Sequence, residues 1–473
     1  MHPTIFEQNP PAPSIVDQSL AGTKLACFWI EDVADTAVRY PHVPGSLNAD
    51  DVVVGGGYAG LWTAIKLKTE HPDRRVVLLE AKRIGGAASG RNGGFCEASI
   101  THGEPNAESR WPDDVEQLRR MGYENLDAME AFITEHGLDV DFERTGQLSV
   151  ANEPYQVEWL GESPDPLVET LDAKAVQQRI ASPTFLGGDF SPHENANLHP
   201  AKLAQELARH AASIGVEIFE HSRVITLAGD EGEPLRFETE HGVVTGQRAA
   251  LCTNVFPSLL KRYVFHTVPV YDYVLMTEPL SDEQLASIGW EGREGLADMA
   301  NQFHYSRLTK DNRILWGGYD AIYYAGGRIR EAYEDREQSY RRLANHFFTT
   351  FPQLAGLKFT HRWAGVIDTS TRFCAFFGQG YGGRVQYVAG FTGLGVGATH
   401  FAADVLVDRL EGRITERTEL AMVREVPLPF PPEPLASIGV NITRWSLDRA
   451  DHNHGKRNVL LKTLDALGLG FDS

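Results

Sequence analysis

The sequence has few cysteines, no excess of positive charge and no long uninterrupted apolar run. Its 473 residues include four cysteines, which lie far apart and form no CxxC motif. A disulfide framework or a thiolate zinc site is therefore not expected, and the reducing cytoplasm is the expected location. The net charge of -20 argues against a general affinity for nucleic acid or for anionic membranes. The cysteines are Cys27, Cys96, Cys252 and Cys374.

No segment is predicted to cross a membrane or to act as a secretory signal. The most apolar stretch, residues 387–407, contains several glycines as well as His400 and Asp404, and it predicts a strand, a glycine turn and a helix. Residues 1–17 lack a basic region followed by a continuous apolar stretch. We therefore expect a soluble protein.

Glycine is abundant, and three glycines near the N-terminus form a nucleotide-binding motif. In such a motif one glycine permits a tight turn, one lets the backbone approach a pyrophosphate, and one lets a helix pack closely on its strand. The pyrophosphate then lies at the N-terminus of that helix, and an acidic residue after the next strand binds ribose hydroxyls. The parts occur here in that order: strand 52–54, Gly55, Gly57 and Gly60, helix 58–69, strand 75–79 and Glu80.

Two further glycine-rich segments favour FAD over NAD. Residues 85–95 directly follow Glu80, and their small side chains allow backbone amides to approach a bulky ligand. Residues 390–397 open the helix that ends near residue 410, so amide groups there can face a ring that becomes anionic on reduction. Nicotinamide becomes neutral when it accepts a hydride and needs no such partner. An NAD-dependent dehydrogenase would leave both segments without a role.

These three motifs resemble those of the D-amino-acid-oxidase-type (DAO) FAD-dependent oxidoreductases. The segment 88–94 most resembles the gamma-glutamylputrescine oxidase-like branch, and the resemblance covers about residues 25–410. It implies an α/β fold, with a discontinuous Rossmann-like FAD-binding domain and an α+β substrate domain built on an antiparallel sheet. It also implies oxidation of an amine or amino acid by hydride transfer to flavin N5. The resulting imine is hydrolysed to a carbonyl compound, with oxygen as the expected acceptor.

The order of apolar patterns predicts the elements and the domains. We expect helices over 115–135, 201–214 and the end of 390–410, and strands over 216–219, 223–227, 249–251, 266–276, 302–308, 313–319 and 385–389. The predicted segments are an N-terminal lead-in (1–48), the FAD-binding domain (49–100, 195–260 and 360–425), the substrate domain (101–194 and 261–359) and a tail with an extended proline segment and a short helix (426–473).

The resemblance assigns cofactor contacts residue by residue. Val224 is expected at the adenine, Ser89, Arg91 and Asn92 at pyrophosphate and ribitol oxygens, and the last glycine segment at the flavin. The expected FAD contacts are Gly55, Gly57, Tyr58, Ala59, Gly60, Glu80, Ala81, Lys82, Ala88, Ser89, Arg91, Asn92, Gly93, Gly94, Val224, Thr253, Asn254, Gly365, Thr392, Gly393, Leu394, Gly395 and Val396.

Substrate contacts are expected on the strands of the substrate domain. His304 and Arg307 fall on opposite faces of one strand, so only one of them can face the flavin. The resemblance favours His304 or Tyr305, together with Asp320, which could pair with an ammonium group. A structural role is an equal alternative for each of them. The candidate catalytic residues are His304, Tyr305, Trp316, Tyr319 and Asp320.

The chain departs from the family pattern at four places. Asp51 stands where an apolar strand residue is usual, and Trp316 where relatives have a lysine that promotes reaction with oxygen. Gly397 replaces a lysine that binds the substrate carboxylate, and 364–365 replaces a cysteine that binds flavin covalently. We therefore predict non-covalent FAD, with Cys374 as a buried strand thiol.

Two alternatives keep the flavin: a dehydrogenase that uses a quinone or a carrier protein as acceptor, and a non-catalytic flavoprotein. Residues 451–454 resemble a metal site only superficially, so no metal is predicted.

Overall fold

The strand that carries the first glycine motif lies at the centre of a mainly parallel sheet. Val52 and Val54 pack on one face of this sheet and Val53 on the other, which explains why the whole run is apolar. The computed structural model describes residues 2–163 and 165–470. The strands of this first sheet are β2 (Ser46–Val54), β3 (Val76–Leu79), β9 (Glu217–Phe219), β10 (Val224–Ala228), β11 (Leu235–Thr239), β12 (Val243–Leu251), β19 (Phe376–Gly380) and β20 (Val385–Ala389).

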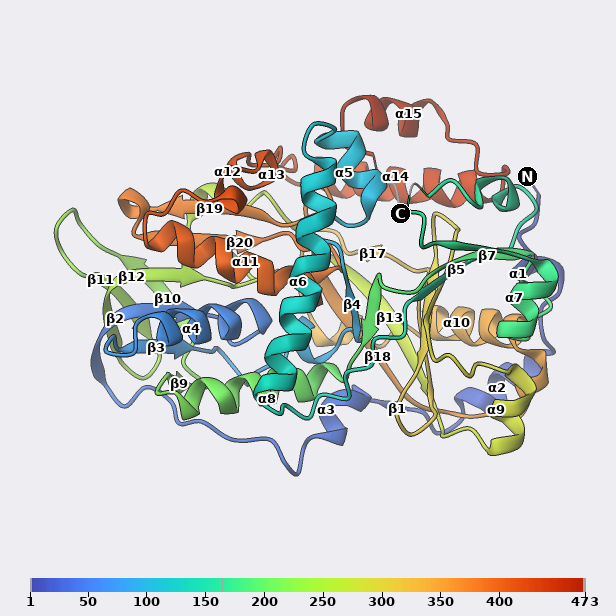
Figure 1. Ribbon diagram of the computed structural model, residues 1–473, viewed down its shortest axis with the longest axis horizontal. Helices are drawn as coiled ribbons and strands as arrows, with labels where there is room; N and C mark the ends of the chain where they lie inside the picture. Colours follow the sequence, from blue (N-terminus) through green and yellow to red (C-terminus); the bar gives the residue numbers. More distant parts are fainter. Residues whose placement is uncertain (1, 164, 471–473) are drawn as a thin grey trace.

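Helices cover one face of the first sheet (Figure 1), and on the other face side chains of β11 pack with Val52 and Val54. The covering helices are α4 (Tyr58–Glu70), α8 (Pro200–Ser213) and α11 (Gly395–Leu410), and α6 (Val115–Glu135) packs across α11. β2 pairs in parallel with β3 and β12, and β12 in turn with β20. The predicted helices over 58–69, 115–135 and 201–214 are confirmed within one residue at each end.

An ion-pair network explains the acidic residue of β2. Asp51 is fully buried, and Arg248 of β12 donates to its carboxylate at 2.6 Å. Arg248 also binds Glu411, directly after α11, at 2.8 Å, and Arg74 binds the same carboxylate at 2.5 Å. Burial raises the pKa of Asp51, and the charge of Arg248 opposes that rise. The buried charge of Asp51 is therefore tolerated, because the guanidinium groups of Arg248 and Arg74 compensate it.

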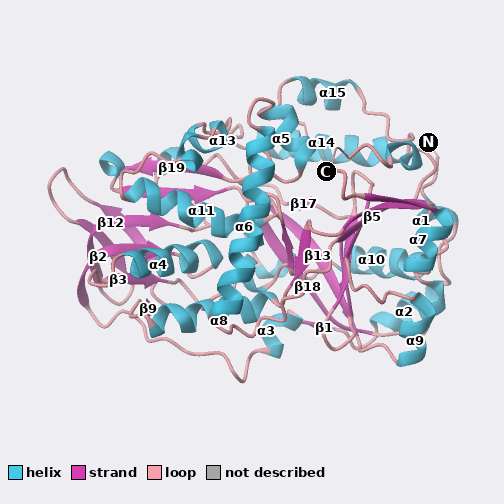
Figure 2. Ribbon diagram, viewed as in Figure 1, coloured by secondary structure: helices cyan, strands magenta, loops and turns pink. Residues whose placement is uncertain are grey.

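The second sheet is mainly antiparallel and lies beside the first, on the right of Figure 2. α10 (Glu337–Thr350) packs on one of its faces, where it meets Tyr273, Trp316 and Phe359. The predicted fold class is confirmed. The strands are β1 (Lys24–Leu25), β5 (Gln147–Ala151), β6 (Glu169–Asp172), β7 (Gly187–Ser191), β13 (Val268–Thr277), β14 (Gly295–Asp298), β15 (His304–Leu308), β16 (Ile314–Gly318), β17 (Ile322–Tyr323) and β18 (Phe359–Thr369).

The remaining elements connect the sheets or pack on their outer sides. The tail differs from the prediction, because two helices follow the proline segment and the first of them spans 17 residues. These elements are β4 (Phe95–Glu97), β8 (Asn195–Asn197), α1 (Ile5–Gln8), α2 (Pro13–Leu20), α3 (Phe28–Asp32), α5 (Glu104–Arg110), α7 (Ala173–Arg179), α9 (Asp282–Ile288), α12 (Glu416–Glu419), α13 (Ala421–Arg424), α14 (Leu435–Asp451) and α15 (Val459–Ala466).

The residue boundaries predicted for the domains stay predictions. β18 falls within the predicted FAD-binding segment 360–425, yet it pairs with β13 in the second sheet. The predicted segments 1–48, 101–194 and 426–473 include Met1, residue 164 and residues 471–473, which lie outside the described residues. Within the described ranges, no helix is long and apolar enough to cross a membrane.

Candidate functional site

The first glycine motif leaves no room for side chains at two of its positions. A Cβ on Gly60, in the first turn of α4, would lie 1.9 Å from the carbonyl oxygen of Gly55. Gly55 itself has a φ of 113°, and a Cβ there would lie 2.3 Å from the carbonyl oxygen of Cys252. Helix α4 therefore starts in direct backbone contact with its strand, as a dinucleotide cradle requires.

Four predicted cofactor residues meet at this cradle. The N–H groups of Gly56 and Lys82 donate to the Glu80 carboxylate at 2.7 and 2.8 Å. Burial raises the pKa of Glu80, and these N–H donors oppose the rise. The hydroxyl of Ser89 accepts from the N–H of Tyr58 at 3.0 Å. The second glycine segment thus lies against the N-terminus of α4, where a pyrophosphate is expected.

Arg91 and Asn92 hold the second glycine segment itself. Arg91 forms an ion pair with Glu334 and donates to the carbonyl of Ala364 at 2.8 Å. The Asn92 side chain donates to the carbonyls of Ala88 and Ser89 and accepts from the N–H of Gly94. Both side chains therefore help to hold the segment in place, and their predicted contacts with pyrophosphate and ribitol oxygens stay predictions.

Two indoles anchor the same segment to the rest of the molecule. Trp29 Nε1 donates to the carbonyl of Asn92 at 3.0 Å, and Trp363 Nε1 donates to the carbonyl of Arg91 at 2.8 Å. Both tryptophans are fully buried. The sequence alone did not link Trp29 or Trp363 to the cofactor segment.

A buried aspartate that sequence reasoning missed fixes the third glycine segment. The Asp368 carboxylate, near the end of β18, accepts from the N–H of Gly390 at 2.5 Å. Burial raises the pKa of Asp368 to about 6, although the N–H groups of Gly390, Phe391 and Thr392 lower it. The Thr392 hydroxyl donates to the carbonyl of Gly390 and accepts from the N–H of Ser370. Gly393, the next residue, has a φ of 93° and is exposed to solvent.

The two later glycine segments both meet one face of the second sheet. On β15, the ring of Tyr305 lies over Gly317 of β16, and a Cβ on Gly93 would lie 2.9 Å from that ring. On β18, the side chain of Ile367 lies 3.9 Å from the Cβ position of Gly393. This face, which we call the roof face, is the one opposite α10.

Asp272 and Gly365 lie between these two contacts on the roof face. They are paired residues of β13 and β18, and Tyr305 donates its hydroxyl hydrogen to the Asp272 carboxylate. Apart from the chain neighbours of Gly365, no described residue has a heavy atom within 4 Å of a Cβ built on this glycine. Asp272, Tyr305, Gly365 and Ile367 are half-buried, although they lie in the middle of the sheet. The roof face therefore borders an accessible space. The alternation of strand 266–276 could have identified Asp272, since it lies between Tyr271 and Tyr273.

The other predicted catalytic residues lie on the opposite face, under or beside α10. His304 stacks on Trp316 and Tyr319, and its Nε2 lies 2.9 Å from Nδ1 of His346 of α10. Trp316 contacts Phe347 of the same helix. The structure thus separates Tyr305 from His304, as the two-residue period requires.

Asp320 is likewise directed to α10 and its flanking residues. Its two carboxylate oxygens bind Arg342 at 2.6 Å and Arg336 at 3.0 Å, and Ser339 donates to it at 2.6 Å. Both oxygens therefore already have partners within the protein. On β16 the roof face carries Leu315 and Gly317, whereas Trp316 points to the α10 side.

The remaining predicted residues fit a bound FAD. Thr253 and Asn254 follow β12 beside the cradle, and the buried atoms Thr253 Oγ1 and Asn254 Oδ1 have no hydrogen-bond partner among the described residues. Orphaned polar atoms next to a glycine cradle are satisfied when a polar ligand binds there. Val224 is half-buried at the start of β10. Gly397 permits close packing, since its Cβ would lie 2.7 Å from the carbonyl of Glu97.

The cysteines and the histidine-containing tail turn are held by contacts within the protein. All four cysteines are buried and free, and Cys374 lies in the turn before β19, not in the strand as expected. Burial raises the pKa of Cys27 to about 11 and of Cys96 to about 12. In the tail, Asp451 accepts from the side chain and the N–H of Asn301. The described residues contain no group of three His, Cys, Asp or Glu side chains that could hold a metal.

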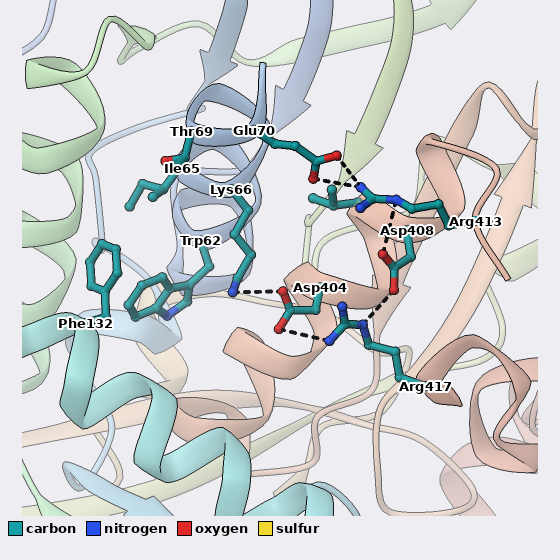
Figure 3. Close-up of a pocket in the computed structure, with 11 residues that line it drawn as sticks. Trp62, Ile65, Lys66, Thr69, Glu70, Phe132, Asp404, Asp408, Arg413 and Arg417 are labelled. Atoms are coloured by element: carbon teal, nitrogen blue, oxygen red, sulfur yellow. Dashed lines mark hydrogen bonds and ion pairs between the residues drawn. The ribbon is translucent and has the colours of Figure 1, made fainter. Parts of the chain in front are cut away.

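A surface pocket of about 320 Å³ lies elsewhere, between α4, α6 and α11 (Figure 3). Trp62 and Phe132 form its apolar wall, and its charged groups are paired with one another. The charges of these pairs neutralise each other. We therefore infer that the pairs hold α11, and the loop that follows it, against α4. The pairs are Lys66 with Asp404, Arg417 with Asp408 and Arg413 with Glu70, at 2.9, 2.6 and 2.7 Å.

Solved structures of known proteins share this fold. The solved structure of glycine oxidase from Geobacillus kaustophilus has a TM-score of 0.65 at 17% identity, covering 80% of this chain and 100% of that one. The structure of L-proline dehydrogenase from P. horikoshii has a TM-score of 0.63 at 16% identity, covering 78% of this chain and 95% of that one. At these identities the likeness shows the fold.

The family follows from the sequence comparisons. Gamma-glutamylputrescine oxidoreductase of Escherichia coli (strain K12) is 30% identical over 398 residues, which are 81% of this chain and 88% of that protein. The predicted resemblance is thereby confirmed. A family model described as FAD dependent oxidoreductase (DAO) matches residues 50–409, which is most of the chain. The chain therefore belongs to the DAO family of FAD-dependent oxidoreductases.

Proposed function

We propose that this protein oxidises a primary or secondary amine, or an amino acid, at the carbon beside the nitrogen. The neutral amine loses a hydride and a proton and becomes an imine, which water hydrolyses to a carbonyl compound and ammonia or an amine. The observation that carries the proposal is the meeting of the second and third glycine segments at one roof face, around Asp272, Tyr305 and Gly365. The named activities of the relatives, on gamma-glutamylputrescine and glycine, support the same reaction class.

The chain contributes binding, orientation and polarity, and FAD, when bound, supplies the hydride acceptor at N5. We assign the ribose to Glu80, the pyrophosphate to the N-terminus of α4, and the flavin edge to residues 392–396, whose turn Asp368 holds in place. Tyr305 and Asp272 then lie on the substrate side. We propose that FAD is held without a covalent bond, since residues 364 and 365 are Ala and Gly and the four cysteines are buried in packed regions.

We propose oxygen as the electron acceptor, with a dehydrogenase as the second candidate. The specific observation behind the second candidate is the composition of β16, which presents Leu315 and Gly317 to the roof face and contains no lysine. The fold occurs in an L-proline dehydrogenase as well as in glycine oxidase.

Absorbance of the purified protein in the visible range tests the proposal. Amines and amino acids are added in the absence of oxygen, and air is admitted afterwards. We expect one class of compound to bleach the flavin, and the rate at which colour returns in air distinguishes an oxidase from a dehydrogenase. A protein that binds FAD but that no amine or amino acid bleaches would contradict the proposal. Acid precipitation, which releases non-covalent FAD into the supernatant, tests the mode of attachment.

A further inference from the structure

Asp272 is a carboxylate on the roof face without a basic partner. The protein packed around it raises the pKa of this carboxyl group to about 6, and hydrogen bonds from Tyr305 and from the N–H groups of Tyr273 and Gly318 oppose the rise. Among the residues that the structure describes, no nitrogen of a Lys, Arg or His side chain lies within 4.0 Å of the carboxylate. Its charge is therefore stabilised by neutral donors alone.

Two basic residues of this region are already engaged. Arg91 is bound to Glu334 and to the carbonyl of Ala364, the neighbour of Gly365. Arg307, on the same face of β15 as Tyr305, is buried and donates to the carbonyls of Gly94 and Leu198 at 2.8 and 2.6 Å. Neither guanidinium group is directed to Asp272 or to a substrate carboxylate beside it.

Open space lies next to Asp272 on the roof face. Gly365, the strand partner of Asp272, has no atom within 4 Å of its Cβ position, and the aspartate side chain is half-buried. A half-buried carboxylate that lacks a counter-ion is stabilised when a cation binds it. Asp320, the acid that the sequence favoured for this purpose, is fully buried and has two arginines.

We propose that Asp272 binds the ammonium group of the substrate, takes one proton from it before the hydride leaves the neighbouring carbon, and thereby selects amines that carry no carboxylate on that carbon. This inference rests on the proposed function and narrows it from amines and amino acids to amines without an α-carboxylate. Tyr305 acts as a positioning residue, because its hydroxyl hydrogen bond fixes the rotamer of the aspartate. An α-amino acid would bring its carboxylate close to Asp272, where like charges repel.

A binding experiment on the FAD-loaded protein tests this selection without turnover. The probes are tert-butylammonium, which has no hydrogen on the carbon beside nitrogen and cannot be oxidised, and pivalate, an anion of the same shape. Binding is measured from the change in the visible flavin spectrum. We expect the wild-type protein to bind tert-butylammonium more tightly than pivalate. We expect Asp272→Asn to weaken binding of the cation roughly 10- to 100-fold, which is the usual effect of a lost charge-assisted hydrogen bond.

Asp298→Asn is the matched control. Asp298 is also a buried aspartate of the second sheet that accepts from a side chain, but its partner is His304, on the α10 side. This variant should keep the wild-type preference for the cation. Equal binding of tert-butylammonium by wild type and Asp272→Asn would overturn the inference, as would a wild-type protein that prefers pivalate. The wild-type comparison is decisive even if Asp272→Asn does not fold.

Pentylamine and norleucine, which differ by the α-carboxylate, separate this inference from the proposed function. We expect kcat/KM to favour pentylamine in the wild type and the preference to narrow in Asp272→Asn, with the change mainly in KM. A wild-type preference for norleucine would overturn the selection by Asp272 while the proposed oxidation stands. Tight binding of tert-butylammonium by a protein that no amine or amino acid bleaches would support Asp272 as a cation site and contradict the proposed function.

Discussion

At the scale of single residues, glycines in this protein serve two different purposes. Gly60 is required by packing, because its Cβ would lie 1.9 Å from a backbone oxygen. Gly365 has nothing within 4 Å of its Cβ position and lies in extended backbone, so the fold itself does not require glycine there. We infer that Gly365 keeps open the space beside Asp272, which the flavin and the amine are proposed to share.

Gly365→Ala should therefore fold normally and bind FAD poorly. Alanine in a strand is favoured over glycine by about 0.5–1 kcal/mol, so the unfolding temperature of the FAD-free protein should stay the same or rise slightly. FAD retention on gel filtration should fall, because the added methyl group enters the ligand space. Gly439→Ala in α14, where the Cβ position is also open, is the control and should retain FAD. If Gly365→Ala keeps both FAD and amine-dependent bleaching, the space has another use.

At the scale of elements, one carboxylate joins a helix to two strands. Glu411 follows α11 and accepts from Arg248 of β12 and from Arg74, which precedes β3. Hydrogen bonds from Arg74, and then from Arg248, lower the pKa of Glu411 to about 2. Asp51 of β2 depends on the same arginines. The position of α11, and with it the third glycine segment at its N-terminus, therefore depends on this network.

Glu411→Gln should lower the free energy of unfolding at pH 7 by about 1–3 kcal/mol, the usual value of hydrogen bonds to a charged group. The folded-state pKa lies below the unfolded value, so the stabilisation is present above about pH 4.5 and is lost as the pH falls toward about 2. Urea unfolding of wild type and variant at pH 7 and pH 3.5 measures the difference, which should shrink at the lower pH. A difference that does not depend on pH would mean that packing, not charge, is lost.

At the scale of the whole molecule, the proposed cofactor site joins the two sheets. The cradle belongs to the first sheet and the roof face to the second. Residues 85–95 contact both parts, because Ser89 accepts from the N–H of Tyr58 at the cradle and Trp363 of β18 donates to the carbonyl of Arg91. Trp29 of α3 holds the same segment through the carbonyl of Asn92. A ligand that binds the folded state alone stabilises it by an amount set by its concentration relative to Kd. FAD should therefore stabilise both sheets together.

Removal of FAD by dialysis at low pH and high salt should lower the unfolding temperature in one cooperative transition. Adding FAD back at 100 times its Kd should restore about 2.7 kcal/mol of stability. Differential scanning calorimetry with added FAD, and with NAD as the control ligand, measures both effects. Stabilisation by NAD but not by FAD would contradict the assignment of the cradle.

Sequence reasoning located the cofactor elements well because their signals are local. The order of strand, glycines, helix and acid lies within residues 52–80, and its geometry follows from backbone sterics and from hydrogen bonds between near neighbours. The spacing of apolar residues predicted the helix over 115–135 equally well. The sequence by itself thus determined the family, the cofactor class and the parallel sheet that carries the cradle.

The tertiary structure decided which residues face the substrate. Alternation in a strand separates His304 from Tyr305, but only the packing of α10 decides which face is covered and which borders the ligand space. Asp320 and Asp272 are both acids of the second sheet, and their difference lies in partners distant in sequence, since Arg336 and Arg342 neutralise the first alone. Such long-range pairing leaves no local pattern, because it depends on how the sheets and helices pack together.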